Sequence, residues 1–100
     1  MSLKRKELKI HNIAKIYVLT LLKQDRHPYI TNKEPLSSFH NAVELAYASL
    51  SSPQKTIINN DFFYQAYPGW WRNIYKKNNY QKLKVEAINR FLEVFYEIEE

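Results

Sequence analysis

The sequence predicts an all-α protein, a single-domain bundle of four to five helices with a helix-turn-helix-like unit in its C-terminal half. Apolar residues recur at spacings of three and four in at least four segments, which is the period of an amphipathic helix. Strand signals are weak, because the chain has one glycine and no Asn-Gly or Asp-Gly hairpin turn. One hundred residues, 45% of them apolar, provide one core. We therefore expect one helical domain over residues 1–100, with a helical pair over 1–50 and the helix-turn-helix-like half over 51–98.

The N-terminal half is expected to form two helices joined by a loop. The first helix should run from about Leu3 to Gln24, and its second half should be buried on more than one side because Leu19 and Leu22 widen the apolar face. The segment "DRHPYITNKEP" then predicts a loop, since the residue before a proline is disfavoured in a helix. The second helix should begin near Glu34 or Pro35. Its narrow apolar seam consists of Leu36, Phe39, Val43, Ala46 and Leu50.

A third helix should follow directly. Ser52 suits the N-cap of this helix, and Pro53 suits its first position, where the missing N–H of proline costs nothing. Pro68 and Gly69 then mark a turn. The residues expected on the inner face of the third helix are Ile57, Ile58, Phe62 and Phe63.

Two further helices are expected after this turn. A short one should cover about Trp70–Tyr75, and a last one should start with Asn78 or Asn79 as its N-cap and end near Ile98. The two adjacent tryptophans can hardly both face the core, because neighbouring helical residues point about 100° apart. We expect one of them to anchor the bundle and the other to be half exposed.

Residue types that carry catalysis are scarce. The absence of cysteine excludes thiolate nucleophiles and Cys-based zinc sites. His11, His27 and His40 are isolated from one another, without a second histidine one helical turn away, so we expect them on the surface or in loops. A single glycine cannot form a phosphate-binding loop, and no serine lies in a nucleophile-elbow context. We therefore expect no enzymatic activity, no metal and no cofactor.

The sequence also argues against a membrane span. The longest apolar block, Ile16–Leu22, is far shorter than the roughly 20 residues that a spanning helix needs. The residues after it do not resemble a signal-peptide cleavage site. We expect a cytoplasmic protein.

Positive charge is concentrated in two parts of the chain. The net charge is +5, with five basic residues against one acidic residue over 1–15, and six against one over 72–90. Such clustering favours an acidic partner, of which nucleic acid is the commonest. A solvated basic surface explains the same charges without any partner.

A basic, asparagine-rich stretch, Lys76–Asn79, precedes the last helix. Free N–H groups at a helix N-terminus attract phosphate, lysine side chains reach phosphates, and asparagine either caps a helix or bonds an adenine edge. A capped, solvated helix start accounts for the asparagines without DNA. The candidate DNA-binding residues are Arg72, Lys76, Lys77, Asn78, Asn79, Gln81, Lys82, Lys84 and Val85.

These candidates are expected to divide by role. Base-reading positions would be Asn79, Gln81, Lys82 and Val85. Phosphate contacts would come from Arg72, Lys76, Lys77 and Lys84, and the N-terminal basic cluster would add backbone contacts. We expect roughly six to ten phosphate contacts in total, and hence strongly salt-dependent binding.

Two segments carry a family resemblance. In "SLSSPQKTIINNDFF" (Ser49–Phe63), a turn with proline precedes a helix whose paired aliphatic residues are followed by an aromatic pair. In "YKKNNYQKLKVEAINRFLEVF" (Tyr75–Phe95), a polar turn leads into a helix with matching positions at Tyr80, Leu83, Lys84, Ala87, Phe91 and Leu92. This half of the chain resembles the sigma-factor region-4-like helix-turn-helix group, and most of all the phage-type regulators of the ArpU/RinA kind. The resemblance implies binding of double-stranded DNA through the last helix in the major groove. RNA polymerase and a second copy of the chain are the further partners to consider.

Two other functions compete with DNA binding. A protein-interaction module, or helical adaptor, would use the seam of the second helix and an exposed tryptophan as its contact surface. Peripheral membrane binding by the basic first helix ranks third, because the apolar positions of that helix are too widely spread around it.

Overall fold

The computed structural model describes the backbone of residues 2–26 and 34–99 and the side chains of residues 2–22 and 37–98. The described chain is all-α, as predicted, and contains no strand. Its elements in chain order are α1 (Leu3–Arg26), α2 (Glu34–Ala48), α3 (Ser52–Ile58), the π-helix η1 (Asn59–Phe63), the 3₁₀-helix η2 (Trp70–Asn73) and α4 (Lys77–Glu99).

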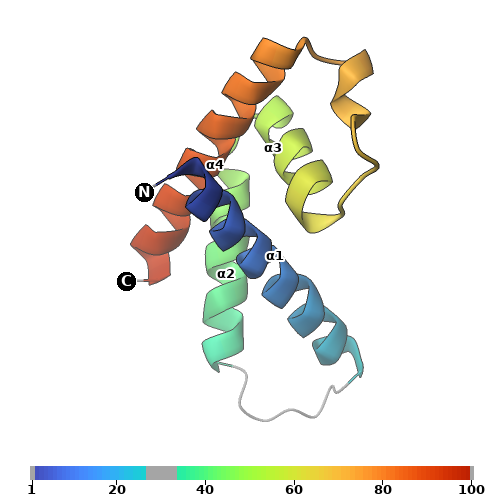
Figure 1. Ribbon diagram of the computed structural model, residues 1–100. Helices are drawn as coiled ribbons and strands as arrows, with labels where there is room; N and C mark the ends of the chain where they lie inside the picture. Colours follow the sequence, from blue (N-terminus) through green and yellow to red (C-terminus); the bar gives the residue numbers. More distant parts are fainter. Residues whose placement is uncertain (1, 27–33, 100) are drawn as a thin grey trace.

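Helix α4 contacts each of the other three α-helices (Figure 1). Helix α3 lies alongside the first half of α4, whereas α1 and α2 meet its second half and diverge from there (Figure 1). The segment with η2 projects at the end of the molecule opposite the last turn of α1 and the first turn of α2 (Figure 1). The N-terminal part of α4 is therefore presented at one end of the bundle.

Most buried side chains form one core between α1, α2, α3, η1 and α4. Phe91 is fully buried at its centre and contacts the rings of Phe63 and Phe95. The other buried members are Ile10, Ile13, Ala14, Ala42, Val43, Ala46, Leu50, Ile58, Phe62, Ala87, Ile88 and Leu92. Burial of these apolar side chains is the main stabilising contribution to the fold.

A second, smaller cluster forms where η2 meets α3 and α4. Its buried members are Ile57, Trp70 and Tyr80. The half-buried side chains of Trp71, Tyr75 and Leu83 pack against it, together with Ala66. Of the two adjacent tryptophans, Trp70 is thus the buried anchor and Trp71 the half-exposed one, in agreement with the prediction that they could not both face the core.

Two predicted caps are wrong, by one residue at α3 and by two or three residues at α4. Ser51 caps α3 in place of Ser52: its hydroxyl accepts from the Gln54 N–H, and the Gln54 side chain accepts from the Ser51 N–H. This reciprocal pair is a capping box, which satisfies two N–H groups that the helix leaves unpaired. Helix α4 begins at Lys77, because the carbonyl of residue 76 already accepts from the Tyr80 N–H. Both asparagines before Tyr80 therefore lie inside its first turn.

The prediction that the second half of α1 is buried on several sides is wrong. Ile16, Leu19 and Leu22 are each about half exposed (48–51%). The contacts of α1 with α2 and η1 lie instead around Tyr17, which packs between His40 and Phe63. A surface position was also wrongly expected for His40, which is buried and lies 2.6 Å from the Thr20 hydroxyl. His11 is exposed as expected, and His27 lies outside the described residues.

No helix within the described residues has both the length and the apolar composition needed to cross a membrane.

Candidate nucleic-acid interface

The carboxylate of Asp61 joins three elements at the base of the candidate interface. One of its oxygens accepts a hydrogen bond from the Trp70 indole N–H at 2.8 Å, and the other accepts from the Tyr80 hydroxyl. The Lys84 ammonium lies 3.5 Å from the same carboxylate. Since these residues belong to η1, η2 and α4, the carboxylate holds the projecting turn against the start of the last helix.

Lys84 is the one predicted phosphate contact that the structure turns inward. Besides Asp61, its ammonium lies 3.8 Å from Glu7, and it sits over the rings of Phe62 and Tyr80 at 5.6 and 5.7 Å from their centroids. Only 20% of its side chain is exposed. The charge of Lys84 is thus balanced within the fold, so a phosphate at this position would have to compete with two carboxylates.

Stacked aromatic and cationic side chains brace η2. The Trp71 ring lies parallel to the Tyr80 ring at 4.4 Å, and the Arg72 guanidinium lies 5.9 Å from the Trp71 ring. Gly69 enters η2 with a φ of +79°, a left-handed conformation that glycine adopts without steric cost. A Cβ at this position would also lie 3.1 Å from the Arg72 side chain. The glycine therefore allows both the turn and the position of Arg72.

The remaining predicted polar residues point into solvent. The exposed ones are Arg72, Lys76, Lys77, Asn78, Asn79, Gln81 and Lys82, and we call this group the basic segment. Val85 is half-buried and offers only part of its surface for contact with a base. The exposed side chains surround the first turns of α4, where the N–H groups of a helix point outward without intrahelical partners.

The charge of the outer face of α4 changes along the helix. Residues 62–85 include no aspartate or glutamate, so no acidic side chain of that stretch opposes the basic segment. At about 100° per residue, Lys82, Glu86 and Glu93 point in similar directions, and both glutamates are exposed. On the outer face of α4, the positive charge without neighbouring glutamates is therefore confined to the first two turns.

Two lysines of the N-terminal basic cluster, Lys6 and Lys9, face the second half of α4. The Lys6 ammonium donates to Asn89 at 2.7 Å, and the Lys9 ammonium lies over the Tyr96 ring at 5.0 Å. Both lysines line one hollow with Glu93. These two amines lie against the acidic part of the helix, so the structure does not bring them to the basic segment.

The connection between α3 and α4 differs from that of a standard helix-turn-helix. Helices α3 and α4 pack on each other, yet residues 59–76 separate them, with η1 and η2 in between. A standard helix-turn-helix joins its helices by a turn of about 3–4 residues. The nearest equivalent here is η2, the turn at residues 74–76 and α4, which keeps the order of short helix, turn and long helix.

Burial and the Asp61 contact raise the pKa of Tyr80 well above its ordinary value near 10. The buried phenol consequently stays protonated and donates to the carboxylate throughout the neutral range. Sequence reasoning missed Asp61, because a lone aspartate between two asparagines and two phenylalanines shows no pattern that marks it as a contact point. Among the residues described, no three His, Cys, Asp or Glu side chains are arranged to hold a metal ion.

Comparisons of the chain with protein-family models, with curated proteins and with solved structures find no match. The likeness to the sigma-factor region-4-like group therefore stays a prediction.

Replacing Tyr80 with phenylalanine should lower the free energy of unfolding by about 1.5–3 kcal/mol, because a hydrogen bond to a charged acceptor is lost. The phenol is held neutral in the fold but ionises near pH 10 when unfolded. Its contribution is therefore full below about pH 10 and is lost as the pH rises toward the higher folded pKa. Urea unfolding at pH 7, 9 and 10.5 measures this. Tyr67→Phe, at an exposed tyrosine, serves as the control. If the difference in unfolding free energy between wild type and Tyr80→Phe were the same at pH 10.5 as at pH 7, the role given to the phenol would be contradicted.

Proposed function

We propose that the basic segment binds duplex DNA, with η2 and the first two turns of α4 as the contact surface. The observation that carries the proposal is the joint exposure of four cationic side chains at one end of the bundle: Arg72, Lys76, Lys77 and Lys82. No aspartate or glutamate lies between residues 62 and 85 to neutralise them. Such a positive surface attracts the phosphate backbone at long range and binds it by counterion release.

The start of α4 supplies the contacts that could orient the protein on DNA. Its outward N–H groups suit a phosphate, and Lys76 and Lys77 flank them. Asn79 and Gln81 carry amide groups of the type that pairs with the N6 and N7 atoms of adenine. The exposed glutamates further along the same face of α4 would repel phosphates. The N-terminal end of the helix, rather than its whole length, would therefore enter the groove.

The structure also sets the expected salt dependence. With Lys84 turned inward and with Lys6 and Lys9 beside Glu93, four cationic side chains remain in the basic segment, fewer than the sequence led us to expect. Four phosphate contacts correspond to a slope of about −3.6 in log K against log salt. Affinity should thus fall on the order of 10²-fold between about 50 and 200 mM salt.

The double substitution Lys76/Lys77→Glu should abolish binding at 50 mM salt, because it reverses the charge at the helix start. Fluorescence anisotropy of a labelled random duplex, titrated at several salt concentrations, measures the affinity and the slope. Lys4/Lys15→Glu makes the same change of net charge on exposed residues of α1 and should retain most of the binding. Equal losses in both variants, or no binding by the wild type at 50 mM salt, would contradict the proposal.

A protein-binding role is the second candidate, and one observation favours it. The outer face of the second half of α1 exposes Ile16, Leu19 and Leu22 by 48–51% each. Contiguous exposed apolar side chains commonly mark a contact with another protein. The described part of the seam that the sequence suggested for this role is not free for a partner, since Val43, Ala46 and Leu50 are buried in the core and Phe39 packs against it. The side chain of Leu36 lies outside the described residues.

Sedimentation velocity over a hundredfold range of protein concentration tests this second candidate with a second copy of the chain as the partner. If the α1 face is an interface between copies, the mass should rise with concentration, and Leu19→Lys should restore the monomer. A wild-type mass that stays that of a 12.1 kDa monomer would contradict self-association through α1.

A further inference from the structure

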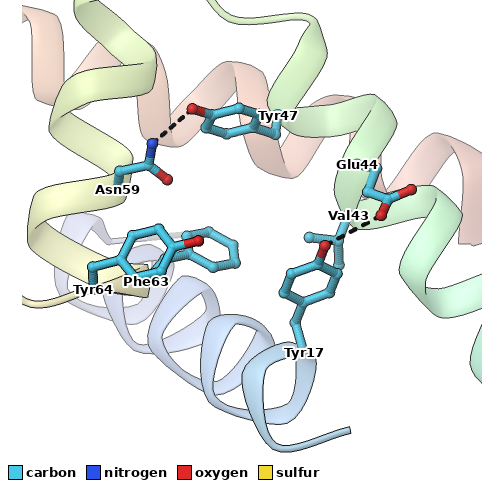
Figure 2. A pocket seen from close by; sticks show the side chains of 7 residues that line it. All are labelled: Tyr17, Val43, Glu44, Tyr47, Asn59, Phe63 and Tyr64. Atoms are coloured by element: carbon cyan, nitrogen blue, oxygen red, sulfur yellow. Dashed lines mark hydrogen bonds between the residues drawn. The ribbon is translucent and has the colours of Figure 1, made fainter. Parts of the chain in front are cut away.

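A small pocket lies between α1, α2 and η1 and shares no residue with the basic segment (Figure 2). Its volume is about 150 Å³. A cavity of about 150 Å³ is large enough for benzene, whereas drug-sized ligands occupy about 300–1,000 Å³. The pocket therefore suits a chemical group of a few heavy atoms. The side chains that define its chemistry are Tyr17, Glu44, Tyr47, Asn59, Phe63 and Tyr64 (Figure 2).

Aromatic rings form most of the pocket wall. The rings of Tyr17 and Phe63 meet nearly at right angles, with centroids 5.8 Å apart and an interplanar angle of 83°. Tyr64, which is 77% exposed, lies next to Phe63 across the pocket from Tyr17 (Figure 2). Ring faces attract a cation that lies within about 6 Å of the centroid. A corner of two rings with a third beside it is an arrangement that a compact cation can fill.

The one ionisable acid that lines the pocket is Glu44. The Tyr17 hydroxyl donates a hydrogen bond to its carboxylate at 3.2 Å. Burial and the nearby carboxylate raise the pKa of Tyr17, so the phenol stays neutral and the charge of the pocket is that of Glu44. Among the described side chains, no lysine or arginine forms an ion pair with Glu44. The carboxylate is thus available to balance a bound positive charge.

The hydrogen-bonding capacity of the pocket limits which cation fits. The Asn59 side-chain amide donates to the Tyr47 hydroxyl at 2.6 Å, so these two polar groups already satisfy each other. The Lys55 ammonium lies 5.5 Å from the centroid of the Tyr47 ring, so this ring already contacts a cation. The rings left for a bound cation are those of Tyr17, Phe63 and Tyr64. A primary ammonium has three N–H donors that need acceptors, whereas a quaternary ammonium has none.

We propose that this pocket binds a small quaternary ammonium compound, with its methyl groups against Tyr17, Phe63 and Tyr64 and its charge balanced by Glu44. The ligand class follows from the aromatic wall, the single carboxylate and the small volume. This proposal does not rest on DNA binding, because the pocket and the basic segment have no residue in common.

Choline and 3,3-dimethyl-1-butanol make the sharpest pair of probes, since they have nearly the same shape and only choline is charged. NMR titration of the isotope-labelled full chain should show choline shifting the signals of Tyr17, Phe63 and Tyr64, with a Kd on the order of 1 mM. The neutral alcohol should bind at least about tenfold more weakly. Equal affinity of the two probes would overturn the assignment to a cation, and no shift with choline at tens of millimolar would overturn the site itself.

Two exposed positions allow variants that leave the core intact. Glu44→Gln keeps the shape of the side chain and should weaken choline at least fivefold while leaving the alcohol unchanged. Tyr64→Leu removes one ring and should weaken choline by a similar factor. Tyr67→Leu, at another exposed tyrosine outside the pocket, is the matched control. Unchanged choline affinity in both pocket variants, with circular dichroism showing an intact fold, would overturn the proposal.

Discussion

The Asp61 carboxylate is the constraint on which the candidate interface depends. It accepts from Trp70 and Tyr80 and faces the Lys84 ammonium, so a single side chain connects η1, η2 and α4. A partly buried carboxylate without such partners would be costly to desolvate, and its partners would lose their acceptor. The contacts therefore stabilise one arrangement of the turn. That arrangement keeps the lysines before and within the first turn of α4 in solvent.

The π-helix η1 supplies residues both to the base of the basic segment and to the aromatic pocket. Asp61 of η1 holds the turn at the base of the basic segment, while Asn59 and Phe63 line the aromatic pocket. A π-turn is rare in proteins and recurs at functional sites. Here the Tyr64 N–H bonds to the Asn59 carbonyl, and the chain leaves the turn through Gln65 with a positive φ of 44°. Packing of Phe62 and Phe63 against different neighbours accompanies this geometry.

Much of the fold could be predicted from the sequence because it depends on the local periodicity of apolar residues and on prolines and a glycine that end helices or form turns. The extents of α1, α2 and α4 follow from apolar spacing and prolines, and the Pro68–Gly69 turn follows from residue type. The π-turn could not be predicted, because apolar residues at Ile57, Ile58, Phe62 and Phe63 fit a continuous α-helix equally well. Burial of His40 depends on Thr20, which is distant in sequence. The inward turn of Lys84 likewise depends on a tertiary contact, with Asp61 and Glu7.

For the candidate site, sequence reasoning identified the exposed polar residues but neither what holds them in place nor the aromatic pocket. Exposure of Gln81 and Lys82 follows from helix geometry once Tyr80 and Leu83 are assigned to the inner face. By contrast, Tyr17, Glu44 and Phe63 come from three separate elements, and only the tertiary packing of α1, α2 and η1 brings them together. A pocket of this kind has no signature within any one segment.

The most direct measurement of the central constraint is residue-by-residue hydrogen exchange in the wild type and in Asp61→Asn. The asparagine has one acceptor oxygen and no charge, so it cannot hold Trp70, Tyr80 and Lys84 together. The account predicts exchange at least about tenfold faster at the Trp70 indole and at the backbone amides of residues 74–83. Amides of residues 42–46 in α2 should exchange as in the wild type. Unchanged exchange at Trp70, or an equal acceleration throughout the chain, would contradict a local role for Asp61.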